Sequence, residues 1–293
     1  MVYCICGGDI RMAELANHAA LEGQEVRVFG FDTAAYFAGG VALYDGPADC
    51  LSGCERVILP LPVTRDGVHL FAPFSGRSFL LPDIWPLIEP GALVCGGKIS
   101  AGLRTDAEAS GIVLHDYLAR EEFAVANAVP TAEGAVQLAM EQLKSTLAGT
   151  PCLILGYGRI GMVLARLLRG MNVPVTVSCR KPGALALAKA MVCAAVPLAA
   201  LSEELPRFSL LFNTGPARIL TPPLLGRIPK DALLIDLASS PGGADPACCR
   251  KLGLKLLIAQ ALPGKVAPVT GGRIIYDTVA AVAADCQTRK EGV

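Results

Sequence analysis

Short apolar runs alternate with longer amphipathic segments along almost the whole chain. Runs of this length predict buried strands, and the segments between them, apolar at every third or fourth position, predict helices such as 12–21. In the first half the predicted strands are 2–6, 25–29, 56–61, 93–95 and 112–114. In the second half they are 152–155, 173–178, 208–212, 232–236 and 254–258. Because strands that alternate with helices favour parallel sheets, we predict an α/β protein with two doubly wound, Rossmann-like domains.

Two long helical patterns divide the chain into domains. The segment 132–147 is rich in Ala, Leu and Met, and Pro130 and Thr131 just before it predict the first turn of a helix. The segment 272–287 is longer and more apolar than a Rossmann domain requires, so we expect it to pack back onto the first domain. The irregular, Pro- and Gly-rich segment 61–90 is expected to shape a pocket. The predicted order is a catalytic domain at 1–130, a linking helix at 131–147, a dinucleotide-binding domain at 148–271 and a returning helix at 272–293, with a cleft between the domains.

A glycine fingerprint follows the apolar run at 152–155, and a helical pattern begins directly after it. A strand, a glycine turn and a helix form the context that a dinucleotide-binding loop requires. The first glycine allows the tight turn, the second lets the pyrophosphate approach, and the third lets the helix pack on its strand. The helix N-terminus then offers N–H groups to the phosphates. The residues of the motif are Gly156, Tyr157, Gly158, Arg159, Ile160 and Gly161.

The turn after the second strand of this domain indicates which nicotinamide cofactor binds. NAD enzymes place an acidic residue here, on the ribose 2′-hydroxyl. This chain instead has Ser178, Cys179, Arg180 and Lys181, with no carboxylate. Because a guanidinium can pair with a 2′-phosphate, we predict NADP, bound with the help of Ser178, Arg180 and Lys181. NAD, and a solvated basic turn without a ligand, remain the alternatives.

Further cofactor contacts are predicted from topology, because ligands lie beyond the carboxyl ends of parallel strands. The loops after the later strands of the second domain meet this condition. For each of their residues the alternative is ordinary turn chemistry. The residues are Asn213, Thr214, Gly215, Pro216, Leu237, Ala238, Ser239, Leu262 and Pro263.

The first domain also begins with a strand and a glycine turn, Gly7-Gly8-Asp9, but the third glycine of the fingerprint is missing. An acidic residue, Asp32, follows the second strand of this domain. It leaves open the alternative of a second ribose site, but the incomplete motif favours a single dinucleotide site in the second domain.

Composition excludes several classes of function. The 26 basic and 26 acidic residues give zero net charge, and no basic run suggests nucleic acid. No run of eighteen apolar residues predicts a membrane span, and no signal peptide is expected before the first strand. The eleven cysteines include no C-x-x-C motif, so reduced thiols of a cytoplasmic protein are expected and no metal. Cys50 with Cys54, and the pair Cys248 and Cys249, are the weak alternative metal ligands.

Four segments flank the fingerprint and carry a resemblance that covers nearly the whole chain. They are 6–11 (CGGDIR), 127–135 (NAVPTAEGA), 236–243 (DLASSPGG) and 261–268 (ALPGKVAP), with 155–162 (LGYGRIGM) between them. With these segments in this order, the chain resembles the A subunit of bacterial dipicolinate synthase. More remotely, the layout is similar to that of alanine dehydrogenase, 2-hydroxyacid dehydrogenases and S-adenosylhomocysteine hydrolase.

The resemblance implies a sporulation enzyme in the mother-cell cytoplasm of a spore-forming bacterium. It implies NADP-dependent oxidation of dihydrodipicolinate, derived from the lysine and diaminopimelate pathway, to dipicolinate, together with the flavoprotein-like B subunit of dipicolinate synthase. Two alternatives remain open: another two-lobed dehydrogenase of amino or hydroxy acids, and a non-catalytic NADP-binding subunit. All three histidines precede residue 116, so the late catalytic histidine of 2-hydroxyacid dehydrogenases is absent.

A dicarboxylate substrate requires fixed cations, and the first domain offers several near the predicted carboxyl ends of its strands. The predicted substrate-binding residues are Gly8, Arg11, Arg65 and Lys98, and the alternative for the three cations is ordinary surface charge. Asp9 and Glu133 are the predicted proton acceptors, with Thr131 beside them in the catalytic set; the alternative for Thr131 and Glu133 is an ordinary helix N-terminus. The segment 132–140 is apolar around most of its circumference, which predicts a homo-oligomer, with a dimer as the expected form.

Overall fold

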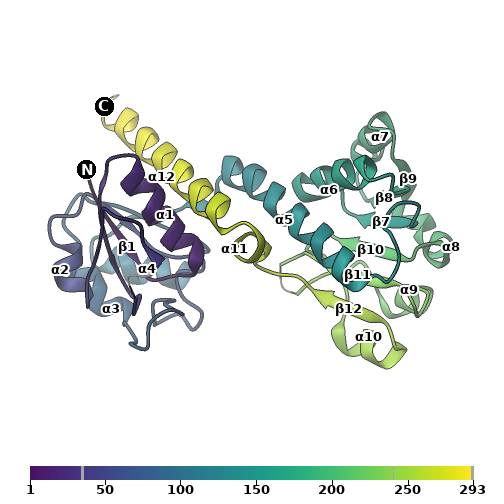
Figure 1. The fold of residues 1–293 in the computed structure, drawn as a ribbon, viewed down its shortest axis with the longest axis horizontal. Coiled ribbons are helices and arrows are strands. Elements are labelled where there is room, and N and C mark those ends of the chain that lie inside the picture. Colours follow the sequence, from purple (N-terminus) through teal and green to yellow (C-terminus); the bar gives the residue numbers. More distant parts are fainter. Residues whose placement is uncertain (34–35, 240, 292–293) are drawn as a thin grey trace. The chain divides into compact units, whose positions relative to one another are not determined.

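The computed structural model describes residues 1–33, 36–239 and 241–291, and the side chains up to residue 288. The chain divides into two compact units. Unit 1 comprises Met1–Asn127 and Ala267–Val293, and unit 2 comprises Ala128–Val266 (Figure 1). No helix in the described part of the chain is long and apolar enough to cross a membrane.

Unit 1 is built on a parallel six-stranded sheet with the strand order β3-β2-β1-β4-β5-β6. Its strands are β1 (Val2–Cys6), β2 (Glu25–Phe29), β3 (Val41–Leu43), β4 (Arg56–Ile58), β5 (Leu93–Gly96) and β6 (Leu114–Asp116). Its helices are α1 (Ile10–Leu21), α2 (Pro47–Leu51), α3 (Leu81–Ile84), α4 (Ala101–Ala109) and α12 (Pro268–Glu291), with short 3-10 turns at Trp85–Leu87 and Tyr117–Ala119. The order reverses at β1, and a reversal of this kind is where open parallel sheets present their ligands.

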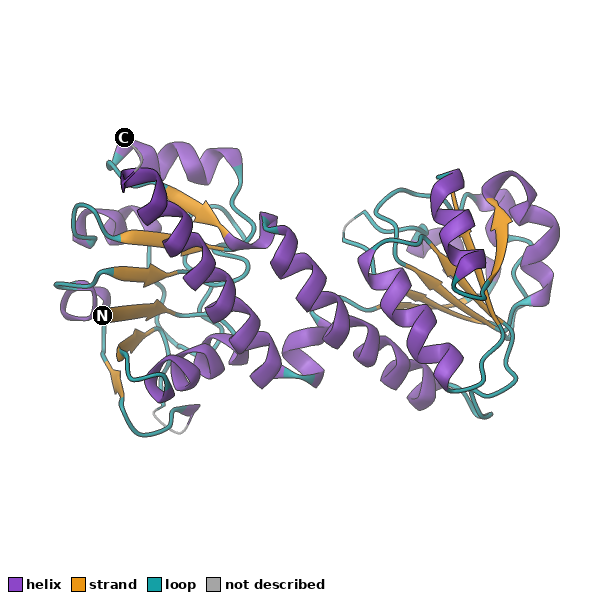
Figure 2. Cartoon of the chain, turned by 90° about the horizontal axis from the view of Figure 1, so that it is seen from above, coloured by secondary structure: helices purple, strands orange, loops and turns teal. Residues whose placement is uncertain are grey.

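Unit 2 repeats this topology, with the strand order β12-β11-β10-β7-β8-β9. Its strands are β7 (Cys152–Leu155), β8 (Val175–Cys179), β9 (Ala194–Pro197), β10 (Leu210–Asn213), β11 (Leu233–Asp236) and β12 (Lys255–Ile258). Its helices are α6 (Arg159–Gly170), α7 (Pro182–Ala190), α8 (Leu201–Glu204), α9 (Pro222–Leu225), α10 (Pro246–Leu252) and α11 (Leu262–Val266), with 3-10 turns at Leu198–Ala200 and Leu205–Arg207. Figure 2 shows the strands of each unit as a single sheet with helices beside it. The predicted fold class of two doubly wound parallel sheets is confirmed.

Helix α5 (Glu121–Gln142) differs from the helix that the sequence predicted. It begins ten residues before position 131 and ends at Gln142 rather than at 147, so Pro130 lies inside the helix and does not open it. A proline in a helix interior costs about 3 kcal/mol. Phe123 and Ala128 are both buried, and this burial on the first two turns offsets the cost. The boundary between the two units falls inside this helix, between Asn127 and Ala128.

The sheet of unit 1 is covered on both faces by apolar side chains that alternate along its strands. Tyr3 and Ile5 of β1 lie in the cluster that α1 and α12 cover, while Cys4 and Cys6 lie in the cluster on the other face. Helix α12 runs beside α1 (Figure 1), and a Cβ at Gly272 would lie 2.6 Å from the backbone nitrogen of Leu15. The returning helix therefore packs against α1 at a distance that only glycine allows.

Candidate functional site

The glycine loop of unit 2 connects β7 to α6 and is tightly packed at its first and third glycines. Gly156 has a φ of +96°, and a Cβ there would lie 2.5 Å from Thr214 Oγ1. A Cβ at Gly161 would lie 2.4 Å from the carbonyl oxygen of Gly156. Both positions therefore require glycine, the first for its positive φ and the second for the close approach of the helix to the turn.

The second glycine has a different environment. Gly158 is exposed, directly precedes α6, and a Cβ there would meet no atom within 4 Å. The first amide groups of a helix have no carbonyl one turn earlier, and the helix dipole makes this end positive. The space at Gly158 next to the start of α6 therefore fits a pyrophosphate, which is the group that the fingerprint predicts here.

The turn after β8 lies next to this loop. The amide of Gly156 donates to the carbonyl oxygen of Ser178 at 2.8 Å, so the glycine loop is bonded to the end of β8. Ser178 Oγ is buried and has no hydrogen-bond partner among the described residues. Arg180 and Lys181, both exposed, follow directly. The turn thus presents positive charge, which fits a dinucleotide that carries an additional phosphate on its ribose.

A buried hydrogen-bond network around Asp236 holds the neighbouring loops. Asp236 Oδ1 accepts from Asn213 Nδ2 at 2.7 Å and from the amide of Ala238 at 3.1 Å, and Oδ2 accepts from the amide of Gly243 at 2.7 Å. Asn213 Nδ2 also donates to the carbonyl oxygen of Gly215 at 2.9 Å. Asn213 was predicted from the sequence as a cofactor residue, and in the structure its side chain connects the loops after β10 and β11.

Asp236 and Gly243 bound the segment 236–243 that carries part of the resemblance, but neither was predicted as a site residue. Asp236 ends β11 and is paired in register with Asn213 at the end of β10, so polar residues at the ends of adjacent parallel strands were the available signal. A Cβ at Gly243 would lie 2.2 Å from Asn213 Nδ2. The network therefore also explains why glycine occurs at position 243.

Replacing Asp236 by alanine is expected to destabilise unit 2. The substitution leaves the amides of Ala238 and Gly243 and one amide hydrogen of Asn213 without their acceptor in a buried site, and each such loss costs about 1–3 kcal/mol. We expect Asp236→Ala to lower the free energy of unfolding by about 2–4 kcal/mol in urea titration. Asp231→Ala, at an exposed position before β11, is the matched control. Equal stability of the two variants would contradict the structural role of the network.

The remaining predicted cofactor residues lie at or after the carboxyl ends of their strands. Thr214 donates through Oγ1 to the carbonyl oxygen of Leu155 at 3.0 Å, which ties the loop after β10 to β7. Leu237 and Ala238 are buried, whereas Pro216 and Ser239 are exposed. In the glycine loop, Tyr157 is buried, Arg159 is exposed and Ile160 is intermediate; at the start of α11, Leu262 and Pro263 are buried.

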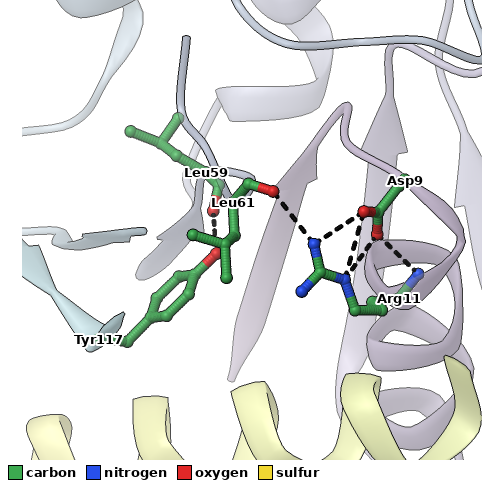
Figure 3. Close-up of polar contacts among 5 residues, drawn as sticks. All are labelled: Asp9, Arg11, Leu59, Leu61 and Tyr117. Atoms are coloured by element: carbon green, nitrogen blue, oxygen red, sulfur yellow. Dashed lines mark hydrogen bonds and ion pairs between the residues drawn. The ribbon is translucent and has the colours of Figure 1, made fainter. Parts of the chain in front are cut away.

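In unit 1, Asp9 and Arg11 form a closed ion pair at the start of α1. Asp9 Oδ1 accepts from the amide of Arg11 at 3.1 Å and so caps the helix. Arg11 Nη2 lies 2.7 Å from Asp9 Oδ2 and also donates to the carbonyl oxygen of Leu61 at 3.1 Å, as Figure 3 shows. The side chain of Arg11 is 7 % exposed. The guanidinium therefore binds its own chain through Nε and Nη2, and Nη1 has no hydrogen bond to the described residues.

The segment after β4 is held by a second hydrogen bond, which Tyr117 makes. Tyr117 Oη donates to the carbonyl oxygen of Leu59 at 3.1 Å (Figure 3), and burial raises the pKa of this phenol. The phenol therefore stays neutral and acts as a donor. Together, Tyr117 and Arg11 fix the chain from Leu59 to Leu61 beside the end of β1.

Removing the charge of Arg11 is expected to destabilise unit 1. Arg11→Met leaves the partly buried carboxylate of Asp9 without its cation, and we expect the free energy of unfolding to fall by about 1–3 kcal/mol. Arg65→Met is the matched control, because Arg65 is exposed and its guanidinium lies only over the ring of Phe71, 4.2 Å from the centroid. Thermal unfolding of both variants measures the difference, and an unchanged melting temperature for Arg11→Met would contradict the pairing.

The other predicted catalytic and substrate residues are spread over both units. Lys98 is exposed, with a φ of +63°, directly after the turn that follows β5. Gly8 is buried against Met12 and Pro60. On α5, Thr131 is buried, and the exposed Glu133 lines an apolar hollow near the C-terminal end of α6.

The glycine turn of unit 1 is in close contact with Phe71 and Ala72 of the same unit. The amide of Gly8 donates to the carbonyl oxygen of Phe71 at 2.8 Å, and a Cβ at Gly7 would lie 2.9 Å from Ala72 Cβ. Asp32 accepts from the amide of Gly76 at 2.6 Å and from Ser75 Oγ at 2.7 Å, and the Gly76 bond is the main cause that lowers the pKa of Asp32. These contacts within unit 1 argue against the alternative of a ribose acid at Asp32.

The two Rossmann-like units, of which one carries a complete glycine fingerprint, form a two-domain α/β fold that also occurs in dehydrogenases. An L-alanine dehydrogenase shares this fold with a TM-score of 0.68 and 13 % identity, over 96 % of this chain and 89 % of the other. The predicted similarity of layout to alanine dehydrogenase is therefore confirmed.

The more specific similarities are to the A subunit of dipicolinate synthase. Residues 2–118 match the family described as the N-terminal domain of the dipicolinate synthase A subunit. The chain is 28 % identical to the dipicolinate synthase A subunit of Bacillus subtilis (strain 168), over 98 % of this chain and 97 % of the relative. The crystal structure of the dipicolinate synthase A subunit from Bacillus halodurans has a TM-score of 0.88 and 28 % identity, over 96 % of this chain and 97 % of the other. The resemblance to the A subunit of dipicolinate synthase is confirmed.

Proposed function

We propose that this protein oxidises dihydrodipicolinate to dipicolinate with NADP as the electron acceptor, as the A subunit of a dipicolinate synthase. The observation that carries the proposal is the open glycine loop at Gly158, which is followed after β8 by Arg180 and Lys181. Similarity to the dipicolinate synthase A subunit over nearly the whole chain supports the choice of substrate. By the same resemblance we extend the proposal to sporulation, in the cytoplasm of the mother cell, where the B subunit is the expected partner.

In this reaction the protein has mainly to bind the substrate and the cofactor and to orient them. The dihydropyridine ring loses one hydride and one proton, and an aromatic pyridine dicarboxylate remains, so aromatisation supplies much of the driving force. When bound, the nicotinamide supplies the hydride acceptor. In this proposal the amides at the start of α6 hold the pyrophosphate, and Arg180 and Lys181 pair with the 2′-phosphate.

We propose that unit 1 binds the two carboxylates of the substrate. Lys98 is an exposed cation close to the carboxyl end of β5, and Arg11 keeps Nη1 available for one carboxylate oxygen. Arg65 is a third cation in the loop after β4. Asp9 holds Arg11 in place and remains the preferred proton acceptor of this proposal. Glu133, the second predicted acceptor, lies near the C-terminal end of α6, at the opposite end of that helix from the glycine loop.

Anaerobic turnover of the purified chain tests the proposed function. Without oxygen, the dihydropyridine dicarboxylate cannot be oxidised by air, so product requires the added NADP. We expect one pyridine dicarboxylate to form per NADP reduced, when this chain is the only protein present. Cofactor binding without any product would favour the alternative of a non-catalytic NADP-binding subunit. Turnover of an amino or hydroxy acid instead would favour another dehydrogenase of the same architecture.

We also propose that the chain forms a homodimer through α5. Ala135 on this helix is fully buried inside unit 2, whereas Met140 is 57 % exposed and lines the apolar hollow with Val136 and Leu167. Apolar residues on two sides of a helix are typical of a helix that is covered on both. Sedimentation at micromolar concentration is expected to show a dimer for the wild type and a monomer for Met140→Lys. A monomeric wild type would contradict this proposal.

A further inference from the structure

A cavity of about 940 Å³ lies at the edge of the unit 1 sheet where its strands begin. The chain just before β4, β5 and β6 forms one side, and Ala283 and Cys286 of α12 form another. Asp9 and Lys98 follow the opposite ends of β1 and β5. The cavity is therefore separate from the groups proposed to bind the substrate.

Arg56, the first residue of β4, lines this cavity and carries a buried charge. It is only 9 % exposed. Its Nη1 donates to Tyr3 Oη, and its guanidinium lies 5.1 Å from the centroid of the Tyr3 ring. No carboxylate among the described residues forms an ion pair with it. Arg11, which is equally buried, differs because Asp9 neutralises it.

A buried guanidinium without a counter-ion is unfavourable, because it loses its hydration and gains no Coulomb partner. Arginine has five N–H donors, and Arg56 uses one of them on the described residues. The acidic residues at the cavity are turned elsewhere or are exposed: Glu55 Oε1 accepts from the amide of Val2 at 3.3 Å, and Glu89 is exposed. An anion from solution would supply the partner that Arg56 lacks.

We propose that this cavity binds a small organic carboxylate, with its carboxylate on Arg56 and an apolar body against the walls. Ile88, Leu93 and Ile112 line the cavity and provide those walls. The volume falls in the range of about 300–1,000 Å³ that is common for ligand pockets. A single buried cation selects one carboxylate, and the apolar walls favour an organic anion over an inorganic ion.

Calorimetric titration with benzoate tests the proposal on the full chain. Benzoate is expected to bind saturably, while benzamide, its neutral analogue of the same shape, does not bind. Arg56→Met is expected to weaken benzoate binding by about tenfold or more, because a charged hydrogen-bonded pair is lost. Arg77→Met, at an exposed arginine of the same unit, is expected to bind benzoate as the wild type does.

Thermal unfolding gives an independent readout. Without ligand, Arg56→Met is expected to melt no lower than the wild type, because methionine removes an unpaired buried charge at similar volume. Benzoate is expected to raise the melting temperature of the wild type but not that of the variant. Ala283→Phe, which fills the cavity from α12 and leaves Arg56 in place, is expected to lose benzoate binding as well.

Three results would overturn the proposal. The first is the absence of saturable benzoate binding to the wild type at millimolar concentration. The second is benzoate binding that survives in Arg56→Met, which would place the ligand elsewhere. The third is a large loss of stability in Arg56→Met without ligand, which would mean that the guanidinium is already satisfied by its own chain.

Discussion

Gly158→Val is expected to abolish binding of the dinucleotide while the fold stays intact. Gly158 has a φ of −93° and a ψ of −160°, an extended conformation that valine adopts readily. Its Cβ would point into a space with no protein atom within 4 Å. If the pyrophosphate occupies this space, an isopropyl group displaces it from the amides of α6. Since each bond to a charged group contributes about 1.5–3 kcal/mol, we expect the affinity for NADP to fall by about 100-fold or more in calorimetric titration.

Gly170→Val is the matched control for this substitution. Gly170 ends the same helix, is exposed, and a Cβ there would also meet nothing within 4 Å. Both variants are expected to melt close to the wild type, and only Gly158→Val is expected to lose NADP. Wild-type NADP affinity in Gly158→Val would show that the dinucleotide does not approach this loop.

Arg180→Ala is expected to remove the preference for NADP over NAD. Arg180 is exposed and its turn has no carboxylate, so its charge is available to a 2′-phosphate. The loss of one charge-assisted bond of about 1.5–3 kcal/mol corresponds to a loss of about 10- to 150-fold in affinity for NADP. NAD lacks this phosphate, so its affinity is expected to stay within about twofold of the wild-type value.

Lys251→Ala is the matched control, because Lys251 is an exposed cation on α10 of the same unit and lies outside the glycine loop and the turn after β8. It is expected to leave both affinities unchanged. Tighter binding of NAD than of NADP by the wild type, or equal losses of both cofactors in Arg180→Ala, would contradict the assignment of the basic turn to the 2′-phosphate.

The fold class could be predicted because the apolar runs and the helical patterns between them indicated the same α/β architecture. Buried parallel strands are near-continuous apolar runs, and ten of these runs mark strands of the two sheets. The short edge strands β3 and β9 were missed although their sequences, VAL and AAVP, are apolar. Strand β3 has only three residues, and β9 ends on a proline, which normally argues against a strand. The predicted start of α5 was wrong. Pro130 normally marks the first turn of a helix, but here the buried Phe123 and Ala128 lie on helical turns that precede it.

The glycine loop was the part of the site that the sequence described best. Its motif depends on local backbone geometry, and Gly156 and Gly161 show the close contacts that the motif predicts. Side-chain partnerships were harder to foresee. The sequence predicted Arg11 as a substrate-binding cation and Asn213 as a cofactor ligand, and the structure adds that each binds an aspartate of its own unit. The pair of Asn213 and Asp236 depends on β10 and β11 becoming neighbours, which spacing along the chain does not encode. The pair of Asp9 and Arg11 is local, because Asp9 caps α1 two residues before Arg11.

Transfer of deuterium from substrate to cofactor tests the central claim most directly. A dihydropyridine dicarboxylate that carries deuterium at the ring carbon that gives up the hydride is incubated anaerobically with the chain and NADP. Mass spectrometry of the cofactor is expected to show one deuterium gained per pyridine dicarboxylate formed, and none with Gly158→Val. Pyridine dicarboxylate that appears while the cofactor stays oxidised, or becomes reduced without deuterium, would contradict direct hydride transfer by this protein.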